Sequence, residues 1–183
     1  AFATPLLGDT LFGQLCWAIR HGWGEARLTD LLDGYTVGRP FLVVSDAFPA
    51  EHLPLPALPA SCWSGQPTNA RERKAIKQKT WVPCTALALP LETWQQQAAT
   101  HRAANADLSS QPQPRNSLNR VTNTTGKGDG FSPYTVRQLS FSPGTVLDLH
   151  VRLDTTRLTQ IELTDALAAI GSAGFGKDAN VGL

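Results

Sequence analysis

The chain has 183 residues, of which 42% are hydrophobic and 17% are charged, and its formal net charge is +1 at pH 7. This composition is typical of a globular protein with a sizeable core, and it excludes a disordered chain or a uniformly basic nucleic-acid binder. Because the overall charge is close to zero, an electrostatic partner has to be recognised through local clusters.

The three cysteines, Cys16, Cys62 and Cys84, are far apart and show no spacing typical of zinc ligands or of a disulfide framework. We therefore expect reduced thiols, no metal site and no cofactor. No apolar run of about 18 residues and no signal peptide is visible, so we expect no membrane partner and a cytoplasmic location. The chain contains no Met and stops within a glycine-rich run, so we expect a longer natural chain on both sides.

The first part of the chain predicts two helices and a strand. Apolar residues recur at helical spacing over residues 10–21, and Asp9 before them is a favourable N-cap. A second helix is predicted over residues 25–33. The β-rich run at residues 40–45 is short and predicts a strand.

The middle of the chain changes character twice. Residues 49–67 contain five prolines, which exclude a regular helix or central strand and predict an extended crossing. The stretch 71–79 then carries five positive side chains against one negative, the densest charge cluster in the sequence. A polar helix is predicted over residues 91–110, followed by a linker-like break at residues 111–114.

The last part predicts two strands and a helix. Residues 134–141 and 145–153 both alternate, and the Pro-Gly pair at 143–144 between them indicates a hairpin. A helix is predicted over residues 158–170, and a glycine-rich loop follows at residues 171–182. These elements together predict an α+β fold with small open sheets and helices on one face. In the second strand, one face carries Val146, Asp148, His150 and Arg152, and the other carries Leu147, Leu149, Val151 and Leu153.

The sequence offers little for catalysis. None of the four histidines has a Ser or Cys partner at a recognisable spacing, and no P-loop or dinucleotide-binding motif is present. His21 has two interpretations: a general base, because imidazole titrates near neutral pH, or a side chain that interacts favourably with the negative end of its helix.

Three segments are better suited to a polyanion such as RNA. The first is the basic stretch 71–79, flanked by Trp63 and Trp81, because aromatic side chains beside Lys and Arg suit unpaired bases. The alternative is an ordinary solvated face. The candidate RNA-binding residues of this segment are Arg71, Arg73, Lys74, Lys77 and Lys79.

The second segment begins at residue 115. Arg115, Arg120 and Lys127 are candidates for phosphate neutralisation, and Asn116 and Asn119 are candidates for hydrogen bonds to ribose or bases. The alternative is a polar loop without a ligand.

The third segment is the glycine-rich loop. Gly174 and Gly176 permit close backbone approach and expose N–H groups, and Lys177 adds a positive charge. Phe175 either anchors this loop or stacks on a base. The alternative for the loop is a tight helix-to-strand connection.

Four blocks in this order resemble the CRISPR-associated RAMP superfamily, above all the handle-binding subunit of type III-A (Csm-type) effector complexes. The pairing of DTLFGQL with SDAFP is the most specific part of this resemblance. The blocks are Asp9–Ala18 (DTLFGQLCWA), Pro40–Pro49 (PFLVVSDAFP), Asn116–Arg120 (NSLNR) with Gly130–Thr135 (GFSPYT), and Gly174–Gly182 (GFGKDANVG).

The resemblance implies two ferredoxin-like (RAMP/RRM-like) modules, one over residues 1–110 with an insert at about 49–83 and one over residues 111–183. It also implies a non-catalytic subunit for antiviral defence that grips the 5′ repeat-derived handle of the crRNA. The implied partners are that RNA, a large polymerase-like subunit and a neighbouring RAMP backbone subunit. The glycine-rich loop is expected to contact the RNA.

Three alternatives stay open. The chain could be a RAMP endoribonuclease that processes precursor crRNA with His21 as acid and base. It could instead bind the handle in another CRISPR complex, for example of type IV. The third alternative is a ferredoxin-like domain that binds no RNA.

Overall fold

The computed structural model describes residues 6–65, 67–105, 108–125 and 133–175. Within them the chain forms helices, short 3-10 turns and strands. The helices are α1 (Gly8–Trp23), α2 (Glu25–Leu32), α3 (Ala70–Lys77), α4 (Trp94–Gln97) and α5 (Gln160–Ala173), and the strands are β1 (Leu42–Pro49), β2 (His52–Pro54), β3 (Trp81–Pro83), β4 (Leu108–Arg115), β5 (Tyr134–Phe141) and β6 (Leu147–Leu153).

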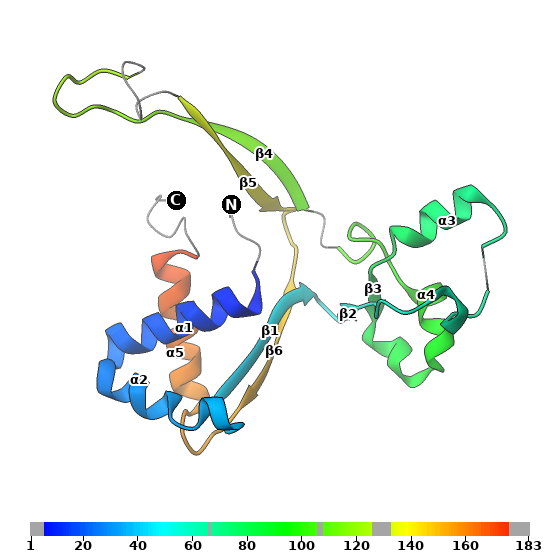
Figure 1. The fold of residues 1–183 in the computed structure, drawn as a ribbon, viewed down its shortest axis with the longest axis horizontal. Helices are drawn as coiled ribbons and strands as arrows, with labels where there is room; N and C mark the ends of the chain where they lie inside the picture. Colours follow the sequence, from blue (N-terminus) through cyan, green and yellow to red (C-terminus); the bar gives the residue numbers. More distant parts are fainter. Residues whose placement is uncertain (1–5, 66, 106–107, 126–132, 176–183) are drawn as a thin grey trace.

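The strands of the described residues form two-stranded antiparallel pairs: β1 with β6, β2 with β3, and β4 with β5. Figure 1 shows three regions built on these pairs. We call them the body (α1, α2 and α5 beside β1–β6), the lobe (α3 and α4 with β2–β3) and the arm (the long β4–β5 ribbon). The architecture confirms the predicted α+β class.

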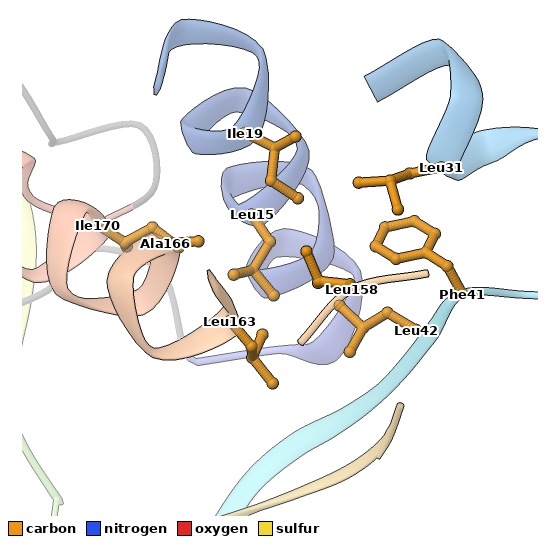
Figure 2. Packing of buried hydrophobic residues seen from close by; sticks show 9 residues of the cluster. All are labelled: Leu15, Ile19, Leu31, Phe41, Leu42, Leu158, Leu163, Ala166 and Ile170. Carbon is orange, nitrogen blue, oxygen red and sulfur yellow. The ribbon is translucent and has the colours of Figure 1, made fainter. Parts of the chain in front are cut away.

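The body contains the main hydrophobic core, and both halves of the chain contribute to it. Leu15 and Ile19 of α1 lie four residues apart on one helical face and are fully buried against residues of β1 and α5. The predicted boundary between residues 110 and 111 falls inside β4. Figure 2 shows the cluster, which consists of Leu15, Ile19, Leu31, Phe41, Leu42, Leu158, Leu163, Ala166 and Ile170.

The start of α1 differs from the prediction that Asp9 is its N-cap. The helix begins two residues earlier than predicted, at Gly8, and Asp46 of β1 accepts the Gly8 N–H through Oδ1 at 2.6 Å. A Cβ at Gly8 would lie 2.9 Å from the carbonyl oxygen of Val44, so only glycine allows this helix start to approach β1 so closely. The N-cap prediction was wrong because the acceptor comes from a strand distant in sequence.

The predicted helix over residues 91–110 was also wrong. Only a 3-10 turn at Leu91–Thr93 and the single turn α4 form, and the chain then pairs with β3, where Ala99 donates its N–H to the carbonyl of Trp81 at 2.6 Å. A polar segment without an apolar stripe gains little from continuing as a helix.

The predicted linker at residues 111–114 is part of β4. Its prolines, Pro112 and Pro114, are two residues apart, so their missing N–H groups fall on the same edge of the strand. A two-stranded ribbon leaves one edge of each strand without a partner, and both prolines are accommodated there.

The predicted hairpin at residues 143–144 is a turn, but it does not pair the strands on either side. Gly144 has φ +83° and Thr145 donates its N–H to the carbonyl of Ser142, yet β5 pairs with β4 and β6 pairs with β1. The pairing with β1 places Leu153 opposite Leu42 at the core, which buries apolar surface that a β5–β6 hairpin would not.

Other elements confirm the sequence analysis. Helix α2 and strand β5 have nearly the predicted bounds, and β1 and β6 overlap the two predicted strands but each begins two residues later. Helix α5 begins with a capping box in which Thr159 accepts the Glu162 N–H and Glu162 accepts the Thr159 N–H.

Candidate nucleic-acid interface

The basic stretch forms α3, which begins with a local cap. Asn69 accepts the N–H of Glu72 through Oδ1 at 2.9 Å, and Glu72 accepts the N–H and hydroxyl of Thr68. These hydrogen bonds hold the pKa of Glu72 below its usual range. Four cations therefore face one ionised carboxylate on this helix. The exposed cations are Arg71, Arg73, Lys74 and Lys77.

Lys79 differs from these four cations, because its Nζ donates to the Gln96 carbonyl at 2.9 Å and joins α3 to α4. The two tryptophans beside the stretch also differ from each other. Trp63 is only 7% exposed and is not the open stacking platform that the sequence suggested. Trp81 is half-buried, and its ring lies 5.9 Å from that of Phe48 in β1.

The arm carries the second group of candidates. Eight residue pairs join β4 to β5, with Arg115 opposite Tyr134 at the outer end. Arg115 is half-buried and its Nη2 donates to Gln113 at 3.3 Å, whereas Arg120 beyond the ribbon is exposed. Arg137 on β5 is exposed as well, and sequence reasoning missed it although the alternation of residues 134–141 predicted its strand.

The asparagines near the arm tip have different surroundings. Asn116 is exposed, whereas Asn119 shapes the turn that follows it. Asn119 Oδ1 accepts the N–H of Val121 at 2.9 Å, and the Asn119 N–H donates to the carbonyl of Thr124. The carbonyl oxygen of this side chain is thus engaged in the turn, and its amide nitrogen is the part left for a ligand.

The end of α5 carries the third group. Gly174 has φ +91° and donates its N–H to the Ile170 carbonyl, so glycine is required where the helix ends. Phe175 packs against the hydrophobic core, which favours the anchoring interpretation of this side chain. The other candidates, Lys127, Gly176 and Lys177, lie outside the described residues.

The candidates do not meet at one point. Figure 1 places α3 at the far side of the lobe and the arm tip at the opposite end of the longest axis. The end of α5 belongs to the body. The described candidates therefore form separate positive or glycine-containing patches and do not line one common pocket.

The described residues contain no cluster of three potential metal ligands. The three cysteines form no disulfide, and burial raises the pKa of the Cys16 thiol. His21 lies in the last turn of α1, with its ring 4.1 Å from that of Trp17. Among the described residues, no helix is long and apolar enough to span a bilayer.

Comparisons with known proteins place the fold. No family model and no curated protein matches the chain. It is similar to a chain in a crystal structure of a Csm1–Csm4 cassette in complex with cA4, with 19% identity, a TM-score of 0.63 and coverage of 96% of this chain and 63% of that chain. Cassettes with pppApA and with AMPPNP give TM-scores of 0.58, with 18% and 17% identity and 91% coverage of this chain. The coverage of those matched chains is 61% and 62%.

The fold is therefore that of a subunit in these two-protein cassettes. This likeness confirms, for the fold alone, the resemblance to a subunit of Csm-type complexes that the sequence blocks predicted. The chain spans only 61–63% of the matched chains. The division into two ferredoxin-like modules stays a prediction.

Proposed function

We propose that this chain is a non-catalytic, guide-RNA-binding subunit of a type III CRISPR effector complex of the Csm kind. In this proposal it grips the 5′ repeat-derived handle of the crRNA in the cytoplasm. It caps the complex next to a large polymerase-like subunit and a neighbouring RAMP backbone subunit. The observation that carries the proposal is the fold match, which extends over 96% of the chain.

The structure supplies a physical reason why two of those blocks occur together. Asp46, from the SDAFP block, accepts the N–H of Gly8, which directly precedes the DTLFG block. In the same block, Ser45 accepts the N–H of His150 through its hydroxyl at 3.1 Å and so ties β1 to β6. The paired motifs thus fix α1 and β6 on β1, which supports reading them as a signature of this fold.

The surface supports RNA as the ligand. The α3 cations, Arg120 and Asn116 are exposed, and no negative side chain other than Glu72 lies on α3. Guanidinium and ammonium groups contact phosphates without reading sequence, whereas the asparagine amide can bond a base or a ribose hydroxyl. Contacts dispersed over lobe and arm suit an extended strand such as the crRNA handle.

The proposal is tested by expressing the chain with the other subunits of its native complex and isolating the RNA that co-purifies. We expect a guide RNA with a constant 5′ tag, together with a large subunit. Recovery of a type IV assembly would replace the type III assignment, and recovery of no RNA would overturn the function.

A charge-matched pair of variants locates the contact. Arg115→Gln with Arg120→Gln removes two positive charges from the arm, and Arg20→Glu changes the charge by the same amount on α1. A plot of the logarithm of the RNA-binding constant against the logarithm of the salt concentration has a slope that counts phosphate contacts. For single-stranded RNA we expect the arm variant to lower the magnitude of this slope by about 1.4, or about 0.7 per phosphate contact, and the control to leave it unchanged. Equal slopes for the two variants would exclude the arm as a phosphate-binding element.

The endoribonuclease alternative is tested with the same protein. The purified chain is incubated with repeat RNA in the absence of metal, and a parallel reaction contains the His21→Ala variant. A single cut that disappears in His21→Ala would replace the non-catalytic proposal, whereas intact RNA in both reactions is the result we expect.

A further inference from the structure

The face of the β1–β6 pair that lies opposite the helices carries cationic and aromatic side chains that the sequence analysis did not propose as RNA contacts, and one of them, Phe48, lies 5.9 Å from the ring of Trp81 in β3. We propose that this face is a second binding track for single-stranded RNA, an inference that rests on the proposed RNA-binding function and deepens it. We call it the open-face track and define it by Arg39, Arg152, His150, Phe48 and Trp81.

The strand register places these side chains on one face. Leu42 pairs with Leu153, and both belong to the core side, so the next pair, Val43 with Arg152, points to the other side. Val43 is 46% exposed, in contrast to the fully buried Leu42. Two residues further along β6, His150 is exposed on the same face and its ring lies 5.9 Å from that of Phe48.

The cationic end of the track is a surface pocket of about 650 Å³. Its lining includes Tyr35, Arg39, Val43 and Arg152, together with one acid, Asp154. Neither Arg39 nor Arg152 has an ion pair or a side-chain hydrogen bond to the described part of the chain. Two guanidinium groups that share one concave surface, without a hydrogen-bond acceptor among the residues that the structure describes, suit a phosphodiester.

The position of Arg39 is built into the fold. Arg157 Nη1 donates to the Arg39 carbonyl at 3.1 Å, and its Nη2 donates to the carbonyls of Asp30, Leu31 and Asp33 at 2.7–2.9 Å. The Arg39 side chain then crosses Gly34, where a Cβ would lie 3.3 Å from Nε and Nη2. Gly34 has φ +74°, so a glycine here gives both the turn and the space for the guanidinium.

The aromatic end of the track continues from the body into the lobe. The Phe48 ring lies 5.9 Å from that of Trp81, and the Trp81 ring lies 5.4 Å from that of His101. Trp81 Nε1 donates to His101 Nδ1 at 3.0 Å, which fixes the indole. His150 and His101 are exposed and Phe48 and Trp81 are half-buried, so the row offers both rigid and accessible rings for base stacking.

Two carboxylates accompany the track, and both are engaged in hydrogen bonds. Asp148 Oδ2 accepts the N–H of Glu51 at 2.7 Å, and Asp154 Oδ1 accepts the hydroxyl of Thr156 at 2.6 Å. The hydrogen bonds from Thr156, with the charge of Arg157, hold the pKa of Asp154 below its usual range, so this group stays ionised at neutral pH. The lining of the pocket retains an excess of positive charge, because two arginines face this one acid.

Phosphate-binding cations at one end and accessible rings along the rest are the two parts of a single-strand binding groove. Base stacking needs unpaired bases, so a duplex would use the cationic end alone. This difference distinguishes single-stranded RNA from a general polyanion.

The experiment measures anisotropy of a labelled single-stranded polyuridine probe with the full chain at several salt concentrations. The test variant is Arg39→Gln with Arg152→Gln, the control of equal charge change is Arg20→Glu, and His150→Ala tests stacking. We expect the double variant to weaken binding roughly tenfold and to lower the log–log salt slope by about 1.4. We expect His150→Ala to weaken binding about fivefold with an unchanged slope.

A second measurement uses the unmodified chain, so its result does not depend on whether a variant folds. Photo-crosslinking of 4-thiouridine RNA to the unmodified chain is expected to label peptides that contain Phe48, Trp81 or His150. Binding that matches the wild type in both track variants, or crosslinks confined to α3 and the arm, would overturn the track but leave the proposed function standing. Absence of RNA binding by the wild-type chain would overturn both, and equal binding of duplex and single strand would overturn the stacking part.

Discussion

The body and the arm are stabilised in different ways. In the body, α1, β1 and α5 bury a continuous apolar cluster, and the polar groups at its edges, such as Asp46 and Arg157, satisfy backbone atoms. The arm is held by the backbone ladder between β4 and β5, and most of its described side chains are exposed or half-exposed. The stability of the fold should therefore depend on the body, and the charge of the arm should be free to serve binding.

The largest effect is expected from a cavity in the body. Leu15→Ala removes a fully buried side chain and should lower the free energy of unfolding by about 3–5 kcal/mol. The same chemical change on the arm side, Leu118→Ala, acts on a residue that is 55% exposed and should cost less than about 0.5 kcal/mol. Urea unfolding followed by circular dichroism measures both, and similar losses would show that the two regions fold as one unit.

A smaller effect is expected at the edge of the body. Arg157→Lys keeps the charge but removes the forked guanidinium that bonds four backbone carbonyls, so we expect a loss of about 1–3 kcal/mol. Arg20→Lys is the matched control, because Arg20 forms one exposed ion pair with Glu25 and should change stability by well under 1 kcal/mol. A loss in the control as large as in Arg157→Lys would contradict the role of the backbone contacts.

The smallest effect is expected at the start of α5. Thr159→Ala removes one half of the capping box and should cost about 1 kcal/mol at neutral pH. Thermal unfolding at fixed pH measures the cost, and Thr164→Ala, whose hydroxyl bonds a carbonyl within the same helix, is the control and should change stability less.

The other half of the capping box makes this cap sensitive to pH. Hydrogen bonds from Thr159, with a contribution from Arg27, hold the pKa of Glu162 below its usual value. Because the folded-state pKa is the lower one, the stabilisation is present above about pH 4.3 and is lost as the pH falls through the folded-state pKa. The difference in stability between the wild type and Glu162→Gln should therefore shrink on acidification, and a constant difference would contradict this assignment.

Sequence patterns correctly predicted the helices and strands that depend mainly on residues close to one another in the chain. Strand β5 follows from alternation, and helices α2 and α5 follow from apolar residues at helical spacing. The predictions failed where a distant residue decides the structure. Asp46, and not Asp9, accepts the backbone N–H at the start of α1. Residue Ala99 forms a hydrogen bond with Trp81 of β3, so the helix expected over residues 91–110 does not continue.

The candidate site shows the same division. Exposed cations on α3 and at Arg120 could be predicted, because a charge-rich stretch stays in water wherever the chain runs. The burial of Trp63 and the hydrogen bond from Lys79 to the Gln96 carbonyl could not be predicted, since both depend on how the lobe packs. The alternation of residues 145–153 did place His150 and Arg152 on one face, but nothing in it showed that Arg39 and Phe48 lie beside them.

The sequence alone determined the α+β class, the main helices and strands, and the resemblance to a RAMP-type fold, because periodicity and motif residues are carried by neighbours in the chain. The tertiary structure decided which strands pair. Strand β6 joins β1 across about a hundred residues, since only that pairing brings Leu153 to Leu42 and closes the core. That choice also created the open face opposite the helices, which has Arg39 and Arg152 at one end and Phe48 and His150 further along.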